Sequence, residues 1–101
     1  MSENFTKEMF SENLNTKFRI PLESSNAAEL ELIEVVGHVS SPRQEQFSVY
    51  FRGPLNYLLP QGTYQMEHEK MGEIALFIVP IGREQDGFRY EAVFNYVLPG
   101  N

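Results

Sequence analysis

Three runs in the C-terminal half of the chain decide the fold: Gly62-Thr63-Tyr64-Gln65-Met66-Glu67-His68-Glu69, Gly72-Glu73-Ile74-Ala75-Leu76-Phe77-Ile78-Val79-Pro80-Ile81-Gly82 and Gly87-Phe88-Arg89-Tyr90-Glu91-Ala92-Val93-Phe94-Asn95-Tyr96-Val97-Leu98. In the first and third runs, apolar side chains recur at every second position, which predicts strands with one buried face. The middle run is apolar on both faces, which predicts a central strand covered on both sides, with Phe77 in the core. The N-terminal helix described below, or residues 55–59, would be the second cover. Asp86-Gly87 is a hairpin signal between the last two strands.

The N-terminal half predicts three more strands with the same period. Residues 17–22 place Phe18 and Ile20 on one face, and Pro21 lacks an N–H group and therefore belongs at an edge or a bulge. Residues 29–39 alternate and then change phase near Ile33, which predicts a β-bulge. Residues 47–52 alternate again, with Phe47, Val49 and Phe51 on one face.

A short helix is expected before these strands, over about residues 6–14. Thr6 is a suitable N-cap, and Phe5 and Phe10 have the spacing of a hydrophobic staple. Leu14 would face the core together with Phe10 and Met9. Asn13 or Asn15 can end the helix in the left-handed conformation.

The sequence therefore predicts a mainly β protein. One short helix precedes about six antiparallel strands in a meander, closed as a small barrel or a strongly curled sheet. The whole chain, 1–101, is expected to be one domain, with a barrel-like body over about residues 16–98.

The charge balance argues against several kinds of partner. The formal net charge is −6, and the eight lysines and arginines are scattered along the chain. An acidic domain repels phosphate backbones, so we expect no nucleic-acid partner, and no basic cluster favours a membrane surface. The N-terminus has neither the basic nor the apolar region of a signal peptide, and no run approaches the ~20 apolar residues of a membrane span. We therefore expect a cytoplasmic protein.

No motif predicts catalysis, a metal site or a cofactor. The chain has no cysteine. His68 lies between Glu67 and Glu69, but adjacent strand residues point to opposite faces, so the three side chains cannot hold one ion. No serine has a nucleophile motif, and the glycines are spaced as turns. We therefore assign no catalytic, metal or cofactor-binding residue.

Arg52 is the residue with the most unusual local sequence, because Gly53-Pro54 ends its strand at once. An arginine at such a position can bind an anion or the carboxylate of a partner. It can also form an internal salt bridge, for which Glu67 and Glu91 are the candidates. Tyrosine is favoured at protein interfaces, although it also suits a barrel rim. The candidate contacts to a partner or an anion are therefore Arg52, Tyr50, Tyr64 and His68.

Over most of residues 29–95 the chain resembles a family of small bacterial proteins that is catalogued as a domain of unknown function. The similarity is carried by residues 47–54, 59–64, 67–69, 76–82 and 89–95 together with Gly72. The resemblance implies a stand-alone bacterial domain. It also implies genes near those of phage-tail-collar-like fibre proteins, and it supplies no catalytic residues.

Three functions are compatible with these observations. The first is a non-enzymatic protein-interaction module, such as an accessory or assembly factor of a phage-tail-like fibre system. Its partner could add a strand to an exposed sheet edge. The second is a small-ligand-binding β-barrel, and the third is an enzyme that uses His68 with Glu69 or Arg52. The sequence leaves the oligomeric state open.

Overall fold

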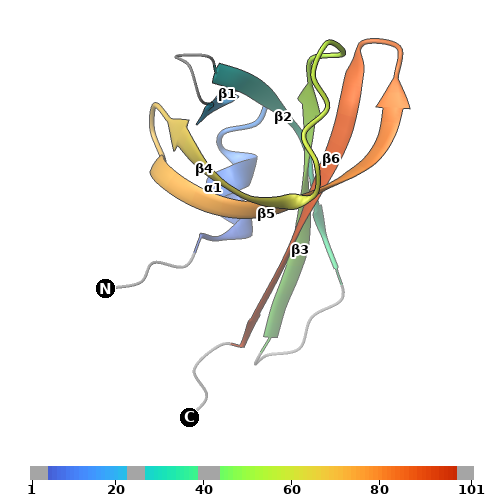
Figure 1. The fold of residues 1–101 in the computed structure, drawn as a ribbon. Coiled ribbons are helices and arrows are strands. Elements are labelled where there is room, and N and C mark those ends of the chain that lie inside the picture. Colours follow the sequence, from blue (N-terminus) through green and yellow to red (C-terminus); the bar gives the residue numbers. More distant parts are fainter. Residues whose placement is uncertain (1–4, 23–26, 39–43, 98–101) are drawn as a thin grey trace.

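The protein is a six-stranded antiparallel β-barrel with one short helix (Figure 1). The computed structural model describes residues 5–22, 27–38 and 44–97. The elements are α1 (Lys7–Ser11), β1 (Lys17–Pro21), β2 (Ala27–Gly37), β3 (Gln44–Gly53), β4 (Gly62–His68), β5 (Gly72–Glu84) and β6 (Gly87–Val97). The predicted mainly β class, the short helix and the closed sheet are confirmed.

The order of the strands departs from a simple meander at one connection. Around the barrel the order is β1-β2-β3-β6-β5-β4, so β3 lies next to β6 and β4 lies next to β1. Pro54 follows β3 and cannot extend its hydrogen bonding, and the irregular segment that it begins reaches β4 on another part of the barrel. The two hairpins that follow then bring β6 back against the whole length of β3, from Gly53↔Phe88 to Gln44↔Val97.

Strand β5 changes its partner halfway along its length. Its first half pairs with β4 as far as Gly62↔Ile78, and its second half pairs with β6 from Val79↔Glu91 onward. Beyond Glu91, β6 pairs with β3 alone among the described residues. The sheet therefore continues past the barrel as a three-stranded extension, which we call the arm, made of residues 35–37 of β2, 44–49 of β3 and 92–97 of β6 (Figure 1).

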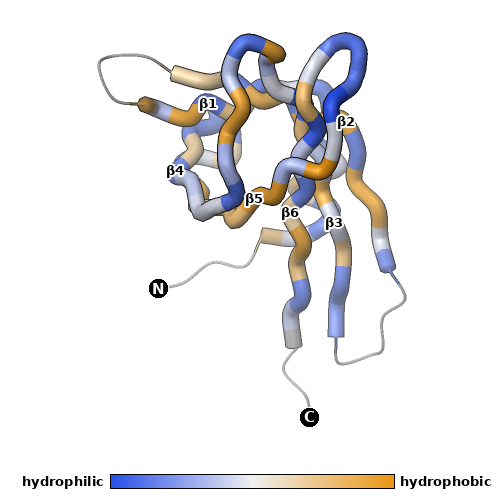
Figure 2. The backbone as a smooth tube through the Cα atoms, turned by 45° about the vertical axis from the view of Figure 1, so that its right-hand side comes forward, coloured by the Kyte–Doolittle hydropathy of each residue, from blue (hydrophilic) through white to orange (hydrophobic). Residues whose placement is uncertain are grey.

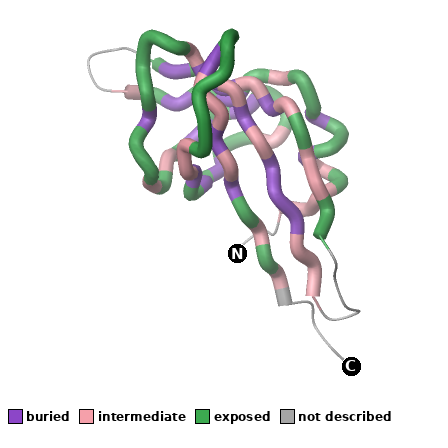
Figure 3. Tube along the Cα trace, turned by 90° about the vertical axis from the view of Figure 1, so that its right-hand side faces the viewer, coloured by how far each residue is buried: buried purple, intermediate pink, exposed green. Residues whose placement is uncertain are grey.

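Hydrophobic and hydrophilic residues alternate along the strands (Figure 2), and buried apolar side chains fill the barrel. All the buried apolar residues of the described chain belong to one cluster, which includes Phe18, Phe51 and Met66 inside the barrel. Burial is concentrated in the barrel and along β3, whereas the far end of the arm is half-buried or exposed (Figure 3). The predicted bulge in β2 is present, because the register with β3 shifts between Leu32 and Glu34.

Helix α1 closes one end of the barrel. Thr6 is its N-cap, and the Oγ1 atom accepts a hydrogen bond from the Met9 backbone N–H at 3.1 Å. The ring of Phe10 is fully buried and lies 5.3 Å from that of Phe94 and 6.0 Å from that of Phe47. The helix is shorter than the expected range of 6–14. It ends at Ser11 with Glu12 as a right-handed C-cap, so the prediction that Asn13 or Asn15 ends it was wrong. Asn15 does have a positive φ, +66°, at the end of the turns that follow the helix.

Two predictions about the core were wrong. The outer face of β5 is not covered, since the side chain of Phe77 is 51% exposed and that of Ile81 is 46% exposed. In a closed barrel each strand has one interior face, and the segments expected to cover the other face instead place Phe10 and Leu59 in the core. Leu14, expected in the core, is 37% exposed because the helix ends before it.

Replacing Phe10 with alanine should destabilise the protein much more than the same change at Phe77. Phe10→Ala removes a buried ring and leaves a cavity, which costs about 3–5 kcal/mol. Phe77→Ala removes a half-exposed ring and should cost less than about 1 kcal/mol. Urea unfolding followed by circular dichroism measures both values. Equal losses in the two variants would contradict the placement of the core.

Candidate functional site

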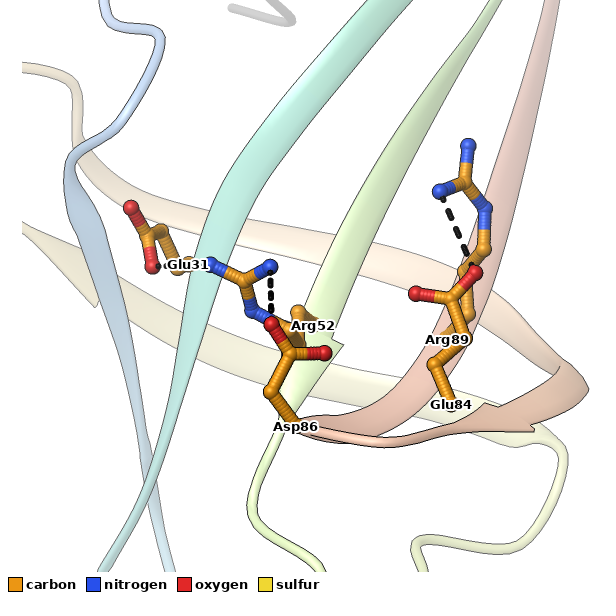
Figure 4. Close-up of polar contacts among 5 residues, drawn as sticks. All are labelled: Glu31, Arg52, Glu84, Asp86 and Arg89. Carbon is orange, nitrogen blue, oxygen red and sulfur yellow. Dashed lines mark hydrogen bonds and ion pairs between the residues drawn. The ribbon is translucent and has the colours of Figure 1, made fainter.

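Arg52 lies on the outer face of β3 and forms two ion pairs (Figure 4). Its Nη2 atom is 3.0 Å from Glu31 Oε1, and its Nη1 atom is 3.0 Å from Asp86 Oδ2. The sequence predicted either a contact to a partner or an internal salt bridge for this arginine. An internal salt bridge is present, but the predicted carboxylates, Glu67 and Glu91, were wrong. The register explains the difference, because Glu31 lies directly opposite Arg52 on β2. Asp86 reaches the guanidinium from the β5–β6 hairpin.

Glu67 and Glu91, the carboxylates that were expected to bind Arg52, contact other side chains. Glu67 forms an ion pair of 2.8 Å with Arg19 across the β1–β4 seam. Glu91 accepts a hydrogen bond of 2.9 Å from the hydroxyl of Tyr50. This bond, aided by burial, raises the pKa of Tyr50 above its ordinary value.

An open groove of about 580 Å³ runs beside Arg52 on the outer surface of the barrel. Its charged lining mixes both signs, with three carboxylates against two cations. The lining residues are Lys17, Ala27, Glu29, Glu31, Arg52, Gly53, Pro54, Asn56 and Asp86. Arg52 already binds two of these carboxylates, Glu31 and Asp86, so both of its terminal nitrogens are in use within the chain.

Glycine occupies two crowded backbone positions beside Arg52, at Gly53 and Gly87. A Cβ atom at Gly87 would lie 2.5 Å from the carbonyl oxygen of Gly53 and 2.5 Å from Cγ of Arg52. A Cβ atom at Gly53 would lie 2.6 Å from Cδ2 of Leu30, inside the barrel. The ion pair between Arg52 and Asp86 therefore depends on close backbone contact between β3 and the start of β6.

A second arginine, Arg89, lies directly opposite Arg52 on β6. The like charges are each offset by carboxylates, because Arg89 contacts Glu34 and also Glu84, the latter at 3.7 Å (Figure 4). The guanidinium carbon of Arg89 also lies 4.8 Å from the ring centre of Tyr50. No local sequence pattern predicted this role of Arg89, although the Asp86-Gly87 hairpin signal could have placed it near the end of β3.

The hydroxyl of Tyr64 donates a hydrogen bond of 2.6 Å to the carbonyl oxygen of Pro60. Partial burial raises the pKa of Tyr64. Tyr64 therefore anchors the loop that precedes its own strand, and its polar group is already in use within the chain.

His68 forms a closed set of hydrogen bonds at the end of β4. Its Nδ1 atom accepts from the backbone N–H groups of Lys70 and Met71, each at 3.0 Å, so this nitrogen carries no proton. The proton of the neutral ring is therefore on Nε2, which donates to Thr16 Oγ1 at 2.8 Å. The Thr16 hydroxyl in turn donates to the carbonyl oxygen of Asn13 at 2.6 Å.

The structure places two of the candidates, Tyr50 and Arg52, on the outer face of β3 and does not bring His68 to them. His68 is 7% exposed and lies on the interior face of β4, whereas Arg52 belongs to the outer face of β3. The neighbour Glu69 is exposed in the turn that follows β4. Within residues 5–22, 27–38 and 44–97, no three His, Asp or Glu side chains are grouped as a metal site would require.

A second hollow, of about 440 Å³, lies between α1 and the β4–β5 turn. Its lining combines partly buried apolar side chains with one charge of each sign: Phe5, Met9, Glu12, Asn13, Lys70 and Met71. Like the groove, it lies outside the barrel, whose interior is packed with side chains.

No helix in the described part of the chain has the length and the hydropathy that crossing a bilayer requires.

A family model described as "Domain of unknown function (DUF6916)" matches residues 5–94. Searches of curated proteins and of solved structures found no match.

Acid should destabilise the protein through His68. Burial lowers the pKa of His68, so the unfolded chain binds a proton more readily than the folded protein does. The contribution of this group to the free energy of unfolding is complete above its unfolded pKa of about 6.5 and is lost as the pH falls below that value. Urea unfolding at a series of pH values from about 8 to about 5 measures the slope of the free energy of unfolding against pH.

His68→Gln should lower the stability by about 1–3 kcal/mol at pH 8, because buried donors lose their acceptor. It should also remove part of the slope between about pH 6.5 and pH 5. His38→Gln, which leaves the contacts of His68 intact, is the control. An unchanged slope in His68→Gln would show that another group is responsible.

Gly87→Ala should cost about 1–3 kcal/mol, because the new methyl group meets a backbone oxygen that cannot move aside alone. Gly82→Ala is the matched control on the neighbouring strand, since a Cβ atom there meets nothing within 4 Å. Thermal unfolding compares the two variants. A Gly87→Ala variant as stable as Gly82→Ala would contradict the close approach of β3 and β6.

Proposed function

Because the chain belongs to the DUF6916 family, whose description assigns no activity, we propose from its geometry that the protein is a non-enzymatic protein-interaction module. The observation that carries this proposal is the free edge of β6 in the arm. Residues 92–97 pair with β3 on one side and with no described strand on the other. Unpaired edges are sites where another chain can add to a sheet.

The state of the polar candidates supports the same function. The side chains of Arg52, Tyr50, Tyr64 and His68 all bind groups within the chain. The groove beside Arg52 is lined by none of the other three candidates. The geometry thus favours binding through the backbone and apolar surface over chemistry at a polar centre.

The finer proposal is that the partner is a fibre protein of a phage-tail-like system, for which this domain is an accessory or assembly factor. Its support is the resemblance of residues 29–95 to small bacterial proteins encoded near phage-tail-collar-like fibre proteins. The acidic charge of the domain is compatible with this role, because it keeps the domain away from nucleic acid.

The function is tested by reconstitution with a purified partner. The tagged protein is isolated from the cells that produce it, and a fibre protein should be enriched over a tag-only control. The two proteins, purified separately, should then form a complex with a dissociation constant below about 10 µM in calorimetry. Failure of every enriched protein to bind in purified form would contradict the interaction function. Binding of a protein unrelated to fibres would support the interaction function but contradict the role in a phage-tail-like fibre system.

A further inference from the structure

The free edge of β6 presents alternate residues to an incoming strand. The His38 backbone N–H donates to the carbonyl oxygen of Gln46 at 2.9 Å, so the main-chain groups of Gln46 point toward β2. In an antiparallel sheet, the backbone N–H and C=O groups of successive residues point to opposite sides of the strand. Those of Phe47 therefore point toward β6, and those of its partner Phe94 point toward β3. The main-chain groups of Val93 and Asn95 therefore point away from β3, toward the free edge.

The sequence of this edge lacks the usual protection against strand addition. Residues 92–97 read Ala-Val-Phe-Asn-Tyr-Val, without a charge or a proline. Natural edge strands are usually protected by lysine, proline or a bulge, because an uncharged edge of high β-propensity recruits other chains. The bulge of β5 lies between Pro80 and Gly82, beyond the free part of β6.

The two faces of the arm offer different surfaces to an added strand. On the inner face, Phe94 packs against Phe10, and the hydroxyl of Tyr96 accepts a hydrogen bond from the Phe5 backbone N–H. On the outer face, Val93 is 64% exposed, and Phe77 is half-exposed on β5. Side chains of an added strand would therefore find apolar contacts on the outer face, at alternate positions.

The charge of the protein selects the kind of occupant. Two copies would each bring a formal charge of −6, and like charges oppose their association. An extended segment with lysine or arginine beside its apolar positions would instead be attracted.

We propose that residues 92–97 of β6 bind, by strand addition, an extended segment of a different protein with apolar side chains at alternate positions and basic residues among them. This inference rests on the proposed function and assigns its binding site. The segment takes the place next to β6 that β5 leaves where it turns toward β4.

The test uses a ten-residue synthetic peptide in which valine alternates with threonine or lysine. Its control is the same peptide N-methylated at alternate residues, which keeps the composition and blocks backbone hydrogen bonds. Titration into ¹⁵N-labelled protein should shift the amide signals of Val93 and Asn95 and protect them from exchange, with a dissociation constant below about 1 mM. The methylated peptide should not bind.

Asn95→Pro removes the N–H group that faces the edge, while the main-chain bonds of Phe94 to β3 remain. It should weaken binding by at least about tenfold. Asn95→Ala is the matched control, because it too loses the 2.8 Å side-chain bond from Gln44 but keeps the N–H group. Asn95→Ala should bind as the wild type does.

Three results would overturn the inference: no binding of the alternating peptide, equal binding to both Asn95 variants, or a wild-type dimer that Asn95→Pro dissociates. The reconstituted partner complex separates this failure from that of the proposed function. If Asn95→Pro binds the purified partner normally, the module stands and its site lies elsewhere.

Discussion

The packing of Phe10 against the strands is the interaction on which the rest of the structure depends. A small barrel has two open ends, and water at either end would reach its interior. Phe10 closes one end through aromatic contacts with Phe18, Phe47 and Phe94, which come from three different strands. The N-cap at Thr6 and the left-handed Asn15 position the helix for this contact. A helix of this length would not be stable in isolation, so its packing against the strands also stabilises the helix itself.

The arm follows from the different lengths over which the strands pair. β3 and β6 share ten residue pairs, whereas β5 accompanies β6 only from Val79 onward. The barrel closes with the residues of β5 that turn toward β4, and the remainder of β6 extends beyond it. The closed body and the open edge are therefore produced by the same change of partner in β5. The aromatic face of the arm lies against Phe5 and Phe10, which leaves its other face and its edge accessible.

Local sequence patterns predicted the helix and the strands. The features that they did not predict are determined by the pairing of strands that lie far apart in the sequence. The period-two alternation located the strands, the phase change at Ile33 located the bulge, and Asp86-Gly87 located the last hairpin. Alternation cannot say what the second face of a strand meets, so the exposed outer face of β5 was not foreseen. The partners of Arg52 were missed for the same reason, because Glu31 is brought opposite by the register of two strands and Asp86 by the hairpin. The free edge depends on where β5 leaves β6, and no local sequence pattern marks that position.

The seam between β1 and β4 has a consequence for how the barrel opens. One residue pair, Arg19↔Glu67, joins these strands in the ladder, and Pro21 has no N–H group to add another. The exposed ion pair of Arg19 and the bond between Thr16 and His68 supplement that pair. Cooperative units with few backbone bonds open at lower free energy than the rest of a protein. We therefore expect the β4–β5 hairpin to swing out as a unit at this seam, while β2, β3 and β6 stay together as the persistent part of the native ensemble.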